Sequence, residues 1–250
     1  MSLTPILLIV ELAFLFVLFG RANTLSFAPS GRLLCYWIWI VFYSGFVSYL
    51  GYRRVFVSDA ILEYLPALWL QMVSVVACIA PALLSPSIRN DLRRAVDGTD
   101  QTSFICLHML RFAALGTLLG AAKGTFPIYF ELLVGVPDLL FAASAIVVLR
   151  RERAGRLSEK QYLIWNLVGA LVIVPATPIV LQLGLPGPLQ VFTSQPDSRV
   201  VFTFPMSIAP MIGVPLLVLV NLLVVWRLID AQATRAAGSD SNLFRRRRVL

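Results

Sequence analysis

The sequence predicts an all-α, polytopic transmembrane bundle, and three observations carry this prediction. Hydrophobic residues make up 58% of the 250 residues and charged residues only 14%, with a mean hydropathy of +0.82. Soluble domains contain about 45–50% apolar and about 25% charged residues, and a chain of this length has too little interior to hide the excess. Apolar runs of the length that an α-helix needs to cross a bilayer, roughly 20 residues, recur along the chain.

Seven apolar stretches are long enough to be spans. They are Leu3–Gly20, Leu33–Tyr52, Tyr64–Leu84, Phe104–Ala122, Phe126–Leu149, Tyr162–Leu183 and Phe202–Leu228. The first has no basic segment before it and no signal-peptide cleavage pattern after it, so we expect it to be retained. Residues 1–229 are therefore expected to form a seven-span domain, and residues 230–250 a basic cytoplasmic tail.

The connections between spans contain turn-forming residues and carry unequal charge. The shortest one, Lys123-Gly124-Thr125, requires the spans on either side to be antiparallel neighbours. On one side of the predicted membrane the basic residues are only Arg53, Arg54, Lys123 and Arg199, whereas the other side holds sixteen. Because cytoplasmic loops carry the excess of Lys and Arg, this positive-inside pattern predicts an outside N-terminus and a cytoplasmic C-terminus.

The basic tail ends in Arg245, Arg246, Arg247 and Arg248. A cluster of this kind beside a membrane is typical of contact with anionic lipid headgroups, here on the cytoplasmic face. The net charge of +8 follows the membrane topology, so no nucleic-acid partner is expected. The lipid bilayer is the expected partner, and other membrane protein subunits stay open as further partners.

Five ionisable residues fall inside predicted spans, where each is costly unless it is paired, neutral or facing water. They are Glu11 in span one, His108 and Arg111 in span four, and Glu131 and Asp138 in span five. In span five, spacings of three and four residues place a set of polar and small side chains on one inward-pointing helix face. That set is Pro127, Glu131, Gly135, Asp138 and Ala142.

Among the ionisable residues inside the predicted spans, Asp138 is the acid that lies closest to Arg111 in membrane depth. At a rise of 1.5 Å per residue they lie roughly 10 Å and roughly 16 Å from the same end of their spans, a difference that an arginine side chain can bridge. The sequence predicts that they form an ion pair, which either fixes helix register or belongs to a functional site. For His108 a satisfied buried histidine is the simpler interpretation, and Glu11 is expected to be protonated and hydrogen-bonded within the bundle.

Prolines interrupt the last two spans. Span six contains Pro175 and Pro178, and span seven contains Pro205, Pro210 and Pro215 together with Gly213. Since each interior proline removes a backbone hydrogen bond, we expect a kink or a non-helical hinge between Pro205 and Pro215, with Ser207 as the nearest donor for the freed carbonyls.

Catalytic, metal and cofactor motifs are absent from the sequence. A single histidine excludes paired-histidine metal or haem sites, and Cys35, Cys78 and Cys106 form no Cys-x-x-Cys motif. We expect no cofactor, no metal and no enzyme activity, although acid–base chemistry by Asp138 and Glu131 stays open.

The segment from Arg111 through Pro127-Ile-Tyr-Phe-Glu131-Leu-Leu-Val-Gly135-Val-Pro-Asp138 resembles a motif of a family of bacterial multipass membrane proteins of unknown function. Trp165-Asn166, Gly169 and the proline-rich last span are similar to the same family. The resemblance implies a bundle in the bacterial cytoplasmic (inner) membrane and supports the Arg111–Asp138 pair. This chain departs from the family at Glu131, where a small residue is usual, and at Asn221, where histidine is common.

Two classes of function are compatible with these features. The first is transport or sensing of a small solute or proton, with Arg111, Asp138 and Glu131 as the polar site and span seven as the moving element. The second is a non-catalytic accessory or scaffold subunit of a larger membrane complex. A wet cavity that reaches Asp138 from one side favours the first, and a dry bundle with a large apolar patch for a partner favours the second.

Overall fold

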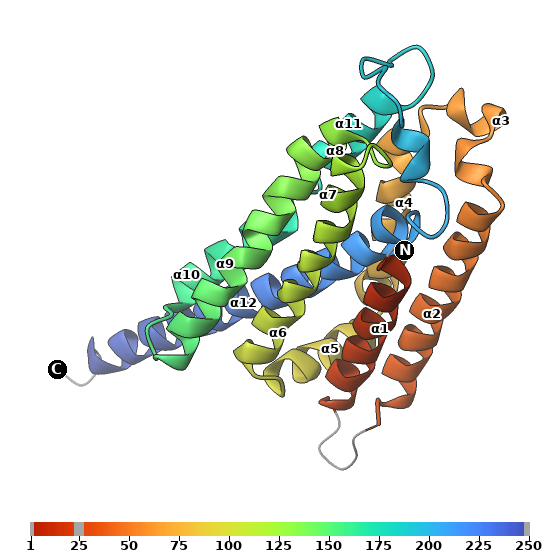
Figure 1. Cartoon of the computed structure of the whole chain (residues 1–250). Helices are drawn as coiled ribbons and strands as arrows, with labels where there is room; N and C mark the ends of the chain where they lie inside the picture. The colour runs from red at the N-terminus through yellow and green to blue at the C-terminus, as the bar shows by residue number, and fades with distance from the viewer. Residues whose placement is uncertain (1–2, 23–27, 248–250) are drawn as a thin grey trace.

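The computed structural model describes residues 3–22 and 28–247, and it describes side chains up to residue 233 and at Arg235. All regular structure within these residues is helical (Figure 1). The long helical segments are α1 (Thr4–Gly20), α2 (Gly31–Tyr52), α4 (Pro66–Leu84), α5 (Pro86–Asp97), α9 (Val136–Arg153), α10 (Glu159–Leu171) and α12 (Val214–Arg247). The short ones are η1 (Val55–Val57), α3 (Asp59–Leu62), α6 (Gln101–Leu107), η2 (His108–Ala113), α7 (Ala114–Ala122), α8 (Ile128–Phe130), η3 (Glu131–Gly135), α11 (Ala176–Gly184), η4 (Ser198–Val200) and η5 (Ala209–Gly213).

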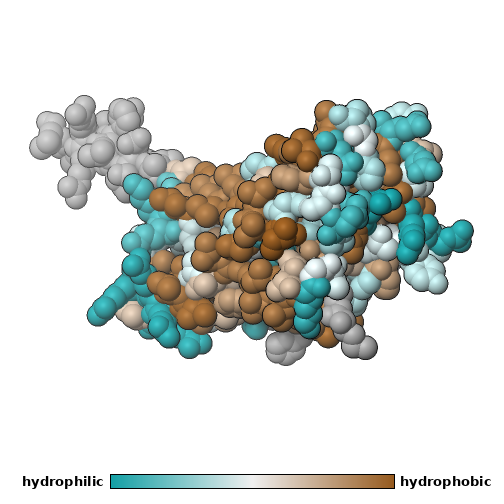
Figure 2. Space-filling model, turned by 45° about the horizontal axis from the view of Figure 1, so that its top comes forward, coloured by the Kyte–Doolittle hydropathy of each residue, from teal (hydrophilic) through white to brown (hydrophobic). Residues whose placement is uncertain are grey.

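Six helical segments are long and apolar enough to cross a membrane. They are Gly31–Tyr52, Pro66–Leu84, Gln101–Ala122, Ile128–Arg153, Glu159–Gly184 and Ala209–Ala233. Helix α1 is apolar but shorter, with 17 residues, and it packs beside α2 and α5. Apolar side chains form a broad band between more polar ends of the molecule, as expected of a multipass membrane protein (Figure 2).

The connections gather at two ends of the bundle (Figure 1). One end, called the α3 end, carries residues 53–65, 123–127 and 185–208. The opposite end, called the α5 end, carries α5 and residues 154–158. The short 123–127 connection joins antiparallel neighbours, because α7 contacts both η3 and α9.

Two predicted spans are interrupted where prolines fall. Span six is not one helix: α10 ends at Leu171, and α11 begins at Ala176 directly after Pro175. Span seven begins later than predicted, at Ala209, because residues 201–208 form turns that contain Pro205. A π-helical segment, η5, then leads into α12, so the non-helical stretch predicted between Pro205 and Pro215 is confirmed.

The expected role of Ser207 in this stretch is wrong. Its hydroxyl is buried against Gly51 and has no hydrogen-bond partner in the part of the chain that the structure describes. The turn is fastened instead by Thr4, whose Oγ1 donates to the carbonyl of Pro205 at 2.7 Å, and by Phe204 N, which donates to Gly51 O at 3.3 Å.

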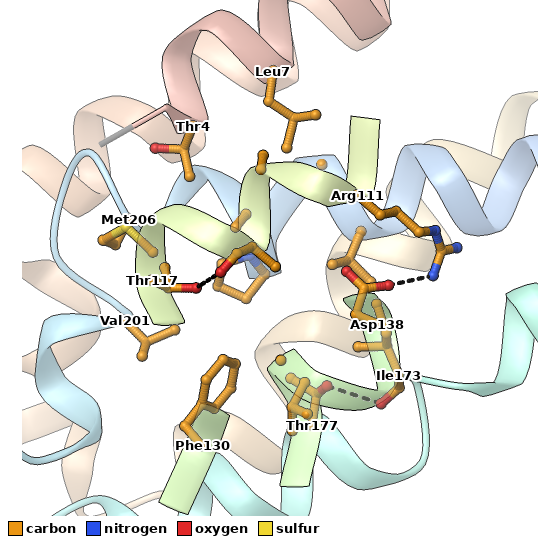
Figure 3. Close-up of a pocket in the computed structure, with 18 of the residues that line it drawn as sticks. Thr4, Leu7, Arg111, Thr117, Phe130, Asp138, Ile173, Thr177, Val201 and Met206 are labelled. Atoms are coloured by element: carbon orange, nitrogen blue, oxygen red, sulfur yellow. Dashed lines mark hydrogen bonds and ion pairs between the residues drawn. The ribbon is translucent and has the colours of Figure 1, made fainter. Parts of the chain in front are cut away.

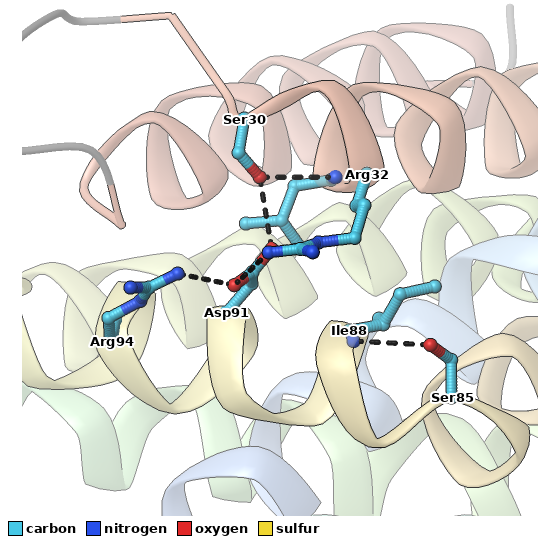
Figure 4. A network of polar contacts seen from close by, with 7 residues as sticks. Ser30, Arg32, Ser85, Ile88, Asp91 and Arg94 are labelled. Atoms are coloured by element: carbon cyan, nitrogen blue, oxygen red, sulfur yellow. Dashed lines mark hydrogen bonds and ion pairs between the residues drawn. The ribbon is translucent and has the colours of Figure 1, made fainter.

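Helix α5 lies across the α5 end and is held by a carboxylate. Asp91 is 1% exposed and accepts hydrogen bonds from Ser30 and Arg32 at the start of α2 and from Arg94 on its own helix (Figure 4). Burial alone raises the pKa of Asp91, but the hydrogen bonds from Arg32, Arg94 and Ser30 outweigh it and hold that pKa below its usual value. Two further ion pairs, Arg93 with Asp230 and Arg227 with Asp97, tie α5 to α12.

Candidate functional site

Arg111 and Asp138 form the predicted ion pair inside the bundle. The Nη1 of Arg111 lies 2.7 Å from Oδ1 of Asp138, and Nη2 donates to the backbone carbonyl of Gly169 at 2.8 Å. The guanidinium carbon also lies 4.8 Å from the centroid of the Phe141 ring, a cation–π distance. Arg111 thus joins η2, α9 and α10 at one point, and the predicted contact is confirmed.

The pair is incomplete as a hydrogen-bonding unit. Arg111 is 3% exposed, yet its Nε has no acceptor among the residues described. Gly169 is required beside it, because a Cβ there would collide with the Phe141 ring and meet Oδ1 of Asn221. The three helices therefore meet tightly around a cation that keeps one N–H group unpaired.

A cavity of ≈ 100 Å³ borders the pair (Figure 3). Asp138 and Arg111 line it together with Thr117, Thr177 and Phe130. The two threonine hydroxyls donate to backbone carbonyls, Thr117 to Ala114 at 2.9 Å and Thr177 to Ile173 at 2.8 Å, so their oxygens can still accept. Because a buried water needs roughly 10–15 Å³ of such space and a few polar partners, the cavity has room for several waters.

This cavity adjoins a larger hollow of ≈ 500 Å³ that leads toward the α3 end. The two share the lining residues Thr4, Ala113, Thr117, Phe126 and Met206. The larger hollow continues to Lys123 and Thr125 in the connection between α7 and α8. The ion pair is thus bordered by open space on its α3 side.

The predicted inward face of span five is present. Pro127, Glu131, Gly135 and Ala142 are buried, and the side chain of Asp138 is 14% exposed. Glu131 begins the π-helical segment η3, and its carboxyl group lies against Gly135, where a side chain would collide with it. Neither carboxyl oxygen of Glu131 has a partner by hydrogen-bond geometry among the described residues.

Glu11 and His108 are both buried in the bundle interior. Glu11 on α1 is 2% exposed, and neither of its carboxyl oxygens finds a donor within the described ranges, so the hydrogen bonding expected for it is wrong. His108 is fully buried, and its ring is perpendicular to the rings of Phe141 and Trp165, which stack on each other, with centroid distances of 5.6 and 5.3 Å. Neither of its ring nitrogens meets a partner with hydrogen-bond geometry there, although the Asn221 amide faces the ring, so the satisfied histidine stays a prediction.

The prolines predicted as a hinge lie beside this site. Pro210 and Gly213 belong to the π-helical segment η5 and line the cavity next to the ion pair. Pro205 lies in the preceding turn, and Pro215 is in the first turn of α12. Their role in a movement stays a prediction.

The cluster Arg245 to Arg248 lies outside the residues whose side chains are described.

The sequence reasoning did not connect Tyr162, Asn166 and Asn221 with the site. All three are at most 2% exposed and carry polar atoms without partners among the described residues. The signal was available in part, because Tyr162, Asn166 and Gly169 follow one another at four and three residues and so share a helix face. Within the described ranges, no group of three or more His, Cys, Asp or Glu residues is placed to hold a metal ion.

Comparison with known proteins identifies a family but no activity. The family described as "Domain of unknown function (DUF8737)" matches residues 67–229, which include Arg111, Asp138 and both proline-interrupted spans. Neither the curated proteins nor the solved structures contain a match to the chain.

Proposed function

Because the chain belongs to that family, whose description assigns no activity, we propose from the structure that it moves or senses a small solute or proton through the Arg111–Asp138 site. One observation carries the proposal: an intramembrane ion pair lines a cavity of ≈ 100 Å³ that adjoins a hollow leading to the α3 end. A purely structural ion pair gains nothing from such space, because water beside it weakens the attraction that holds the helices together.

The chemistry of the site suits a small polar species. Asp138 supplies a carboxylate, and Arg111 supplies an Nε–H group without an acceptor among the described residues. About two helical turns away on the same span, Glu131 supplies a carboxyl group that meets no donor with hydrogen-bond geometry among those residues. Intramembrane carboxylates paired with a cation are typical of proton relays and solute sites. The π-helical segments η3 and η5 on either side of the cavity are the helix irregularities that often accompany functional sites.

We further propose seven spans in a bacterial cytoplasmic membrane, with the α3 end outside. At 1.5 Å per residue, the 17 residues of α1 cover about 25 Å, slightly less than the hydrocarbon thickness of about 30 Å. The excess of Arg on α5 and on residues 150–156 supports a cytoplasmic α5 end in contact with anionic headgroups.

This orientation is tested with two exposed basic positions, one at each end. Cysteine at Lys123 is expected to react with a membrane-impermeant thiol reagent added outside, and cysteine at Arg153 only after the membrane is opened. The reverse result would place the hollow on the cytoplasmic side.

The function proposal itself is tested by water access to the cavity. Thr117→Cys places a thiol where the cavity and the larger hollow meet, whereas Leu115→Cys on the same helix turns toward the exposed apolar surface and serves as the control. Cys35 and Cys106, which are exposed, are first replaced by serine. We expect a charged methanethiosulfonate to modify Thr117→Cys rapidly from the α3 side and Leu115→Cys hardly at all, because the reagent needs water to form a thiolate. Equal, slow labelling of both would contradict a solvent-connected site and favour the accessory-subunit function.

A further inference from the structure

A second set of buried polar side chains lies next to Arg111, away from the cavity. It consists of His108 on η2, Asn221 on α12, and Asn166 and Tyr162 on α10, and it is called the polar row here. His108, Asn166 and Asn221 are fully buried and Tyr162 is 2% exposed. Both ring nitrogens of His108, both amide atoms of Asn221, the Oδ1 of Asn166 and the hydroxyl of Tyr162 meet no partner with hydrogen-bond geometry among the described residues. His108 nevertheless faces Asn221, and Tyr162 faces Asn166, as neighbouring polar side chains.

The members of the polar row are contiguous. Arg111 donates to the carbonyl of Gly169 at 2.8 Å. The space beside Gly169 is filled by the Phe141 ring and by Asn221, whose amide faces His108. One turn nearer the start of α10 lies Asn166, and one further turn along the same face lies Tyr162. The Nδ2 of Asn166 donates to the carbonyl of Tyr162 at 2.9 Å, which links the last two members.

The row ends at the α5 end of the molecule. Tyr162 lies in the first turn of α10, directly after the Ser158–Gln161 capping box. Its backbone N–H donates to the carbonyl of Ser158 at 3.0 Å, and Ser158 closes the 154–158 connection at the α5 end. The row therefore covers the half of the bundle that the cavity does not reach.

The unpaired atoms of the row are too concentrated to be incidental. Folded proteins leave few buried polar groups without a partner, and each one left so costs about 1–3 kcal/mol. Apart from Gln71, Arg93 and Ser207, every described side chain with such an atom belongs either to the polar row or to the group of Glu11, Arg111 and Glu131. Polar side chains that face one another without completing their hydrogen bonds, repeated along one half of the bundle, indicate groups that bind water or protons transiently.

We infer that the polar row carries protons between the Arg111–Asp138 pair and the α5 end, which makes a proton the solute of the proposed function. The inference rests on the proposed function and adds the path from the ion pair to the α5 end. The cavity connects the pair to the α3 end, and the row connects it to the α5 end. Together they form one route across the membrane.

The residue types of the row match this task. A neutral imidazole accepts a proton at one ring nitrogen and releases the proton held on the other, so His108 passes a charge without a net change. The amides of Asn166 and Asn221 each offer donors and an acceptor that position bridging water, and the Tyr162 hydroxyl both accepts and donates. Each transfer breaks one O–H or N–H bond and forms another.

Few charged groups face this route. Arg111 is on the same helix as His108, one turn away, and its charge is balanced by Asp138. Among the described residues, Glu131 on the neighbouring span and Glu11 on α1 are the other carboxyl groups buried near the pair. The stacked rings of Phe141 and Trp165 pack perpendicular to the ring of His108 and shield it from lipid.

The test measures proton flux in vesicles that contain the purified full-length chain and a trapped pH-sensitive dye, driven by a potassium diffusion potential. Tyr162→Phe removes one hydroxyl that makes no hydrogen bond. Tyr36→Phe is the matched control, because Tyr36 is an equally buried tyrosine whose hydroxyl donates to the Cys78 carbonyl away from the row. We expect Tyr162→Phe to lower the flux by about 100-fold, the contribution of a positioned proton-transfer group, without lowering the melting temperature. Tyr36→Phe should do the opposite, lowering the melting temperature but not the flux.

Proton flux at the wild-type level in Tyr162→Phe would overturn the polar row as the route. If Tyr162→Phe does not fold, Asn166→Leu is measured instead, and flux at the wild-type level in Asn166→Leu would overturn the route in the same way. Absence of flux from the wild-type protein would also overturn the inference, but it would leave the proposed function intact where Thr117→Cys is still labelled from the α3 side. Loss of that labelling would instead remove the proposed function.

Discussion

Asp91 and Asp138 differ in how completely their carboxylates are hydrogen-bonded. Asp91, at the α5 end, is 1% exposed and is satisfied by Ser30, Arg32 and Arg94. Asp138, in the middle of the bundle, pairs with Arg111 and lines a cavity. The nearby carboxyl groups of Glu131 and Glu11 meet no donor with hydrogen-bond geometry in the part of the chain that the structure describes. The first arrangement is what stability alone favours. The second gives up hydrogen bonds where burial makes them most valuable, which is typical of a working site.

The largest effect on folding is expected when one partner of the Arg111–Asp138 ion pair is removed. Arg111→Ala or Asp138→Ala leaves one charge uncompensated among apolar helices, which costs about 3–5 kcal/mol for buried pairs. We expect each single variant to lower the yield of folded protein in mild detergent, and the double variant to lower it less. Normal folding of both single variants would mean that water compensates the remaining charge. The Asp91 and Asp138 regions would then differ mainly in how much water reaches each carboxylate.

Packing around the pair is tested next, at Gly169. A methyl group there collides with Phe141 and reaches Oδ1 of Asn221, and overpacking of this kind costs about 1–3 kcal/mol. Gly116→Ala is the control, because the nearest neighbour of its added methyl group is Leu3 at 3.9 Å. Thermal unfolding should show a lower midpoint for Gly169→Ala only. Similar midpoints for both variants would contradict the close approach of α9, α10 and α12 at Arg111.

A smaller loss is expected at the satisfied carboxylate. Asp91→Ala removes hydrogen bonds from Ser30, Arg32 and Arg94, each of which is replaced in part by water because the two arginines are more than half exposed. We expect a cost of about 2 kcal/mol in the free energy of unfolding, and faster proteolysis at the start of α2. Unchanged stability would show that α5 is held by its apolar contacts and by its ion pairs with α12.

The smallest effect is a dependence on pH. Because the folded pKa of Asp91 is lowered below 3.8, its contribution to stability is complete above that pH and is lost as the pH falls through the lowered value. The difference in unfolding midpoint between wild type and Asp91→Asn should therefore shrink on acidification below about pH 4 and stay constant between pH 5 and about 8. A difference that grows with acid would mean that Asp91 is not ionised in the fold.

The sequence alone identified the membrane class and the Arg111–Asp138 pair, because apolar length and charge depth are local properties of each span. Helix interruptions at Pro175 and around Pro205 were also predictable, since proline acts on its own backbone. The partners of Asp91 and the polar row were not. Ser30 and Asp91 are 61 residues apart, and Asn221 approaches Gly169 only through the packing of α10 against α12. Whether a buried polar group is satisfied depends on such distant contacts, so the sequence could not show that Glu11 lacks a donor among the described residues or that His108 faces Asn221.

We infer that the Arg111–Asp138 pair does more than hold helices together. The most direct measurement is proton flux through vesicles that contain the double variant Arg111→Gln/Asp138→Asn, which replaces both charges with neutral amides, of the same shape at Asp138 and shorter at Arg111. We expect a folded protein, judged by its melting temperature, with flux reduced to the level of empty vesicles. A double variant that folds and conducts protons like the wild type would contradict it, and would leave the pair as a structural contact.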